Sequence, residues 1–87
     1  MCADDAYGQA RRIFEIIAAS LGELGADLND VIRSRIYLAD MSDFAAVAEV
    51  HAQYLGAAAP AATCVQVSAF VDARMRVEIE VDAVVAR

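Results

Sequence analysis

The sequence contains no lysine and no tryptophan, and it has a single histidine, a single proline and two cysteines among 87 residues. All seven basic residues are arginines, and thirteen acidic residues give a net charge of −6. A nucleic-acid-binding protein normally presents a basic surface, so this charge argues against RNA or DNA as a partner. No segment approaches the ~20 apolar residues of a membrane-spanning helix, so we expect no membrane partner.

The two cysteines do not form the framework of a disulfide-rich domain. Cys2 lies near the start and Cys64 well inside, and the acidic start lacks the basic and apolar regions of a secretory signal. We therefore expect reduced thiols and a cytoplasmic protein. A lone histidine without a cluster of cysteine or acidic side chains predicts no metal site, and no motif indicates a cofactor.

Apolar side chains, in contrast, are abundant. They make up 60% of the chain, whose length fits one domain spanning residues 1–87. A chain this short buries only about 60–65% of its extended surface on folding. We therefore expect an exposed apolar surface that a partner covers, most simply a second copy of the chain.

Two segments have apolar side chains at helical spacing. The first covers residues 5–24, with Asp4 or Asp5 as its N-cap and Gly25 after its end. Its stripe consists of Ala10, Ile13, Phe14, Ile17, Leu21 and Leu24. The second helix starts after Asp40 or Ser42 and ends at Gly56. Its inner side is predicted to carry Phe44, Val47, His51, Tyr54 and Leu55.

Three segments alternate as strands, at residues 31–38, 63–69 and 75–85. In the first, one face carries Ile32, Ser34, Ile36 and Leu38. In the last, apolar residues alternate with Arg76, Glu78, Glu80 and Asp82. The order αβαββ predicts an α+β fold of two layers, with the helices on one face of the sheet.

The other, helix-free face of this sheet is predicted to be charged. It would carry Arg33, Arg35, Arg76, Glu78, Glu80 and Asp82. Arginines and carboxylates on neighbouring strands can pair with one another, which is compatible with an ordinary solvated face. The alternative is a face that is partly buried in an oligomer and holds a polar ligand, because buried charges must be paired or functional.

Three motifs in order resemble one family. They are Val31–Val47, the Pro60–Val67 segment PAATCVQV, and the Val77–Ala83 segment VEIEVDA. On these motifs the chain is similar to the Rid family, the YjgF/YER057c/UK114 proteins that are also labelled L-PSP endoribonuclease or translation initiation inhibitor. The resemblance implies a chorismate-mutase-like α+β fold and a homotrimer with ligand clefts between subunits. In such a trimer the charged sheet face would be an inter-subunit wall.

The family's activity, by this resemblance, is hydrolysis of reactive enamine or imine intermediates with release of ammonia. Glu78 matches the family's site glutamate, which implies a catalytic role in contact with water. Cys64 and Thr63 fall in the second motif, and Cys64 is expected to be part of the pocket wall. Arg35 and Tyr37, on the charged face, are further candidate ligand-binding residues.

The sequence also departs from the family pattern. Ala62 occupies the ligand-site position where the family has its substrate-clamping arginine, and a methyl group cannot hold a carboxylate. Ala48 and His51 replace a common asparagine and a common tyrosine. Arg33 or Arg35 could replace the missing cation, although pairing with the strand carboxylates is the simpler expectation. The N-terminal β-hairpin that the resemblance implies is also missing from this sequence, which leaves a naturally short form and a truncated chain as alternatives.

Three functions remain open from the sequence. The first is a trimeric metabolite-binding protein that hydrolyses imines, and the second is a non-catalytic ligand-binding or regulatory module. The third, ribonuclease or translation inhibitor, fits the acidic charge least. His51, on an apolar helix face, is expected to be a packed and hydrogen-bonded residue and not a ligand-binding one.

Overall fold

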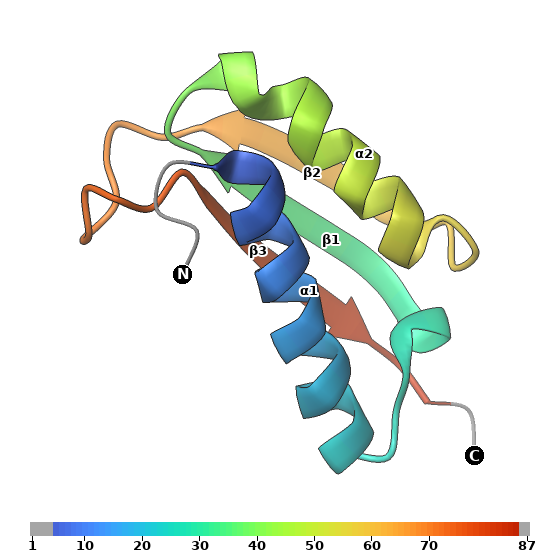
Figure 1. The fold of residues 1–87 in the computed structure, drawn as a ribbon. Helices are drawn as coiled ribbons and strands as arrows, with labels where there is room; N and C mark the ends of the chain where they lie inside the picture. The colour runs from blue at the N-terminus through green and yellow to red at the C-terminus, as the bar shows by residue number, and fades with distance from the viewer. Residues whose placement is uncertain (1–4, 86–87) are drawn as a thin grey trace.

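The computed structural model describes residues 5–85, in which two helices cover one face of a three-stranded sheet (Figure 1). The elements are α1 (Ala6–Glu23), β1 (Val31–Leu38), α2 (Phe44–Leu55), β2 (Ala61–Gln66) and β3 (Val77–Ala83). Short 3-10 turns, η1 (Leu28–Asp30) and η2 (Met41–Asp43), precede β1 and α2. The predicted α+β class and the order αβαββ are confirmed. None of the described helices is both long and apolar enough to cross a membrane.

Strand β1 lies at the centre of the sheet, whose order is β2-β1-β3. It pairs with β2 in parallel and with β3 in antiparallel orientation. The parallel pair requires a crossover, which α2 provides on the same side as α1 (Figure 1). All three strands therefore present alternate side chains to the two helices and to the helix-free side.

The core lies between the helices and the sheet. Its largest fully buried side chains are Phe14, Val31, Ser34, Leu38, Val47, Val50, Leu55 and Val77. Phe14 of α1 stacks on Tyr54 of α2, with ring centroids 5.1 Å apart. This contact fixes the two helices against each other above β1.

The helix ends follow the expected signals in part. Gly25 has φ +80, the left-handed conformation that follows many helix C-termini. Asp5 occupies the N-cap position of α1 without a side-chain cap bond, and Asp4 lies outside the described residues. Asp40 accepts from the backbone N–H of Ser42 at 2.9 Å, so it caps the turn η2 and not α2 itself.

The start of β1 differs from the predicted alternation because of a β-bulge. Val31 pairs with Ala83 and Arg33 with Asp82, so Ile32 is an extra residue in β1. Val31 is 2% exposed and Ile32 is 54% exposed. The prediction that Ile32 shares the inner face with Ser34 is therefore wrong.

Two further apolar residues lie outside the predicted inner faces. Leu24 is 76% exposed because α1 has already ended at Glu23, and Phe44 is 47% exposed at the start of α2. The bounds of the strands also differ from those expected. Strand β2 covers 61–66 and not 63–69, because its partner β1 ends at Leu38, opposite Gln66.

The chain before β3 is held by α1. The buried amide of Gln9 donates to the carbonyl of Arg74 at 2.9 Å and accepts from the N–H of Arg76 at 2.8 Å. The side chain of Arg76, predicted on the charged sheet face, pairs instead with Asp43 at 3.3 Å. Strand β3 begins only at Val77, so Arg76 lies outside the alternation and next to η2.

Candidate functional site

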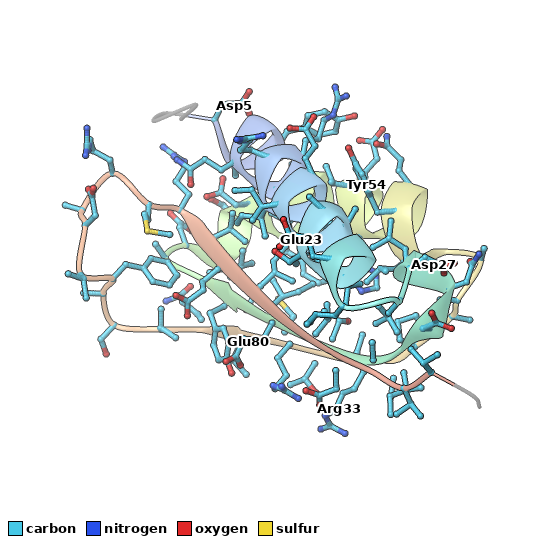
Figure 2. All side chains as sticks on the ribbon, turned by 90° about the horizontal axis from the view of Figure 1, so that it is seen from below. Asp5, Glu23, Asp27, Arg33, Tyr54 and Glu80 are labelled. Atoms are coloured by element: carbon cyan, nitrogen blue, oxygen red, sulfur yellow. The ribbon has the colours of Figure 1, made fainter. Side chains whose placement is uncertain are left out.

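The helix-free face of the sheet carries a network of polar side chains from β1 and β3. Arg35 donates from Nε to Glu80 at 3.1 Å, and its two terminal nitrogens donate to both oxygens of Asp82 at 3.0 and 3.1 Å. The hydroxyl of Tyr37 donates to Glu80 at 2.7 Å. Figure 2 shows Arg33 and Glu80 projecting from the sheet on the side away from the helices. Antiparallel pairing of β1 with β3 places Arg35 directly opposite Glu80, whereas Asp82 lies opposite Arg33 and Tyr37 lies opposite Glu78.

This network shifts the titration of its members. Bonds to Asp82 and Glu80 hold the pKa of Arg35 above its ordinary value. Bonds from Tyr37 and Arg35 lower the pKa of Glu80, and Arg35 lowers that of Asp82. The guanidinium of Arg35 is therefore already occupied by carboxylates. Arg35 therefore pairs with carboxylates of the neighbouring strand, which was the simpler of the two expectations for it.

Glu78 and Thr63 belong to the same face but not to this network. Glu78 pairs in register with Tyr37, and Thr63 pairs with Arg35 across β1 and β2. Both are exposed. Among residues 5–85, no hydrogen bond or ion pair joins Glu78 to another side chain. Its carboxylate is thus open to solvent or to a second molecule.

A separate cleft lies on the opposite side of the sheet, between α2 and the strands β1 and β2. It measures about 330 Å³ and is lined by Ile36, Phe44, Ala48, His51, Ala62, Thr63 and Cys64. Ala62 and Cys64 pair with the inward residues Ser34 and Ile36, so they face the helix side. Thr63 lies between Ala62 and Cys64 and also lines the cleft, although it pairs with Arg35, which faces the helix-free side.

His51 is tied to the wall of this cleft. Its Nε2 lies 2.7 Å from Oγ of Ser34, a fully buried hydroxyl on β1. Its ring meets Phe14 edge-on, with centroids 6.1 Å apart. Burial lowers the pKa of His51 below its ordinary 6.5, so the imidazole is neutral at pH 7. The prediction of a packed, hydrogen-bonded histidine is confirmed, although His51 also borders the cleft.

Cys64 has the character of a wall residue. It is half-buried, and burial raises the pKa of its thiol above the ordinary 9.0. A thiol whose pKa is raised by burial stays protonated at pH 7 and is a weak nucleophile. Among residues 5–85, no three histidine, cysteine or acidic side chains are grouped to hold a metal ion.

The predicted site residues are thus divided between the two sides of the sheet. Ala62 and Cys64 line the cleft under α2, whereas Glu78, Arg35 and Tyr37 lie on the helix-free face. One chain alone does not bring Glu78 to the cleft. The bond between Ser34 and His51 was missed, although a serine at an inward strand position and a histidine on an inner helix face were both visible in the sequence.

Comparison with known proteins gives one consistent family. The family model of endoribonuclease L-PSP matches residues 1–85. A RutC family protein of Pyrococcus abyssi is 45% identical over 64 residues, which are 74% of this chain and 50% of that protein. The 3-aminoacrylate deaminase RutC of Acinetobacter baylyi is 40% identical over 63 residues, which are 72% of this chain and 50% of that protein.

The solved structures agree. Rv2704 of Mycobacterium tuberculosis, described as a member of the YjgF/YER057c/UK114 family, superposes with a TM-score of 0.91 at 44% identity. The alignment covers 94% of this chain and 70% of that one. The chain spans about half the length of the first curated relatives it matches. It belongs to the endoribonuclease L-PSP family, which includes the YjgF/YER057c/UK114 and RutC proteins.

Proposed function

We propose that this protein binds a small metabolite in the cleft between α2 and the β1–β2 pair. The observation that carries this proposal is the cleft itself, at about 330 Å³ and with mainly apolar walls. Small-molecule sites in proteins typically measure ~300–1,000 Å³ and combine apolar walls with a few polar groups. Here His51, Thr63 and Cys64 supply the polar groups.

The reaction we assign to this site is hydrolysis of an enamine or imine, in which water adds to the C=N carbon and ammonia leaves as the carbonyl forms. Membership of the family and the similarity to a 3-aminoacrylate deaminase support this assignment. Glu78 would orient the water or exchange its proton. Because Glu78 lies across the sheet from the cleft of its own chain, it would act on the cleft of a neighbouring copy, as in a homotrimer.

A second function, ligand binding without turnover, is favoured by one observation. Ala62 lines the cleft at the position where the family, by the resemblance described above, has its substrate-clamping arginine. A substrate carboxylate would therefore have no cation there. An RNA-cleaving function has less support, because a chain with charge −6 and no lysine would repel a polyanion.

Ammonia release separates these functions. Imines are generated in situ by an L-amino-acid oxidase, which gives carboxylate-bearing imines, and by a flavin-dependent amine oxidase, which gives uncharged ones, with catalase present. We expect release above the buffer rate for at least one class, and loss of that rate in Glu78→Gln. Glu49→Gln, an exposed carboxylate on α2, is the matched control.

No acceleration with either imine removes the deaminase function and leaves binding. An unaffected Glu78→Gln variant would contradict the assignment of Glu78. Light scattering on the same samples measures the oligomeric state. A trimer would support the proposal that Glu78 of one copy acts on the cleft of its neighbour, and a monomer would refute that proposal.

A further inference from the structure

Within residues 5–85, the walls that one chain gives to the cleft carry no charge. The residues that line it there include no arginine, lysine or carboxylate, and the guanidinium of Arg35 lies on the other sheet face in bonds to Asp82 and Glu80. Removing an ionised group from water without a charged or well-bonded partner is strongly unfavourable. An anionic ligand would therefore lose its solvation in this cleft and gain no cation in return.

The Ser34–His51 bond also fixes which proton the cleft can offer. The Ser34 hydroxyl is fully buried, and within residues 5–85 its only hydrogen-bond partner is Nε2 of His51. If Nε2 carried the proton, the serine hydroxyl hydrogen would be left without an acceptor, at an unfavourable free energy. Ser34 therefore donates to Nε2, and the neutral imidazole carries its proton on Nδ1.

We propose that the cleft takes an uncharged small molecule, with a carbonyl oxygen or imine nitrogen accepting from Nδ1–H of His51 and an apolar body against Phe44 and Ile36. The proposal rests on the cleft being the ligand site, as argued above, and it names the class of ligand. In the same chain Ala62 and Ala48 leave room for that apolar body where larger side chains would project.

Two probes of similar shape and different charge test the class of ligand. Acetophenone is neutral and has a carbonyl acceptor, whereas benzoate is an anion. In backbone amide NMR titrations we expect acetophenone to shift the signals of Ala48, His51 and Cys64 saturably, and benzoate to bind there at least about tenfold more weakly, the factor expected when a charged group lacks its partner. Tighter binding of benzoate in the cleft would overturn this inference while leaving the cleft as the ligand site.

A pair of variants separates failure of the inference from failure of the site. Ala62→Arg supplies a cation inside the cleft, and Ala61→Arg, the matched control, places the same charge one residue earlier, on the other face of β2. We expect Ala62→Arg alone to gain benzoate binding. If neither probe shifts the cleft signals in the parent chain and Ala62→Arg gains nothing, the cleft is not a ligand site.

The proton position is directly observable because His51 is the only histidine in the sequence. Long-range ¹H–¹⁵N correlation spectra at pH 7.5 distinguish the two neutral tautomers of an imidazole. We expect the Nδ1–H form, with a further shift of the Nδ1 resonance on adding acetophenone. A predominant Nε2–H form, or an Nδ1 signal that acetophenone leaves unchanged, would contradict the assigned donor.

Discussion

The two faces of the sheet are made by the same three strands and follow different rules. On the helix side, stability comes from packing, because Leu38, Val77 and Ser34 are fully buried. On the helix-free side, the side chains form ion pairs. Arg35 binds Glu80 and Asp82, and these three side chains remain partly exposed, at 29, 51 and 52%. Burial makes shape critical on the first face, whereas solvent screening makes individual charges replaceable on the second.

The largest expected difference is between two neighbours on β1. Leu38→Ala removes a fully buried side chain and should lower the free energy of unfolding by about 2–5 kcal/mol. Tyr37→Phe removes the bond to Glu80 on the other face and should cost ~1 kcal/mol or less. Urea denaturation measures both. If Leu38→Ala does not fold, Ile79→Val, at 8% exposure, should cost about 0.5–1.5 kcal/mol. Equal costs on the two faces would contradict the comparison.

The next largest difference in stability is expected between two residues at the bulge that begins β1. Val31→Ala removes buried methyl groups and should cost about 1.5 kcal/mol, at ~0.8 kcal/mol per buried carbon. Ile32→Ala, although it removes a larger side chain, should change stability by less than ~0.5 kcal/mol because Ile32 points to solvent. Thermal and urea unfolding of the two variants provide the measurement. The reverse order would mean that β1 alternates without a bulge.

Arg35→Met tests whether a second copy of the chain covers the charged face. Within one chain, the loss of partly exposed ion pairs should cost about 1 kcal/mol or less, and less still at high salt. In a trimer that covers this face, Glu80 and Asp82 would become unpaired at the interface, so the molar mass by light scattering should fall. Arg12→Met, which removes an exposed pair with Glu15 on α1, is the control that should keep the mass. An unchanged mass in Arg35→Met would place the face outside any interface.

The smallest expected effect concerns pH, and the two faces should respond at different values. The folded pKa of His51 is lowered by burial, so the unfolded chain binds its proton first, and stability should decline as the pH falls below the ordinary 6.5. The pKa values of Glu80 and Asp82 are also lowered, so a second decline in stability should begin as the pH falls below their ordinary 4.5 and 3.8. Urea midpoints measured from pH 8 to pH 3 should show both declines. His51→Gln should remove the first and keep the second, and a first decline that persists in this variant would assign it to another group.

Much of the fold could be predicted from residue patterns. The stripe containing Phe14 and Leu21 predicted α1, the alternation around Ile79 predicted β3, and Gly25 marked the end of the first helix. The residues that were placed wrongly lie where a local pattern meets a partner strand or an element end. Ile32 is displaced by a bulge that depends on pairing with β3, and Arg76 lies one residue before β3 begins.

The candidate site was harder to predict than the fold. Family resemblance identified Ala62, Cys64 and Glu78, but strand alternation places the first two under α2 and the third on the opposite face. Parallel pairing of β1 with β2 brings Ala62 next to Ser34, and α2 then brings His51 within 2.7 Å of the same serine. The sequence pattern places each of these two residues on an inner face, but it does not show that they pair, because their contact depends on the crossover.

By itself, the sequence determined the class of the fold, the acidic charge that disfavours nucleic acid, and the absence of a cation at Ala62, since these follow from residue types and their periodicity. Only the tertiary structure decided that Arg35 is occupied by Glu80 and Asp82, and that Oγ of Ser34 lies within hydrogen-bond distance of Nε2 of His51. The physical reason is that hydrogen bonds and ion pairs act over a few ångströms. Such distances between remote residues are set by strand register and helix packing.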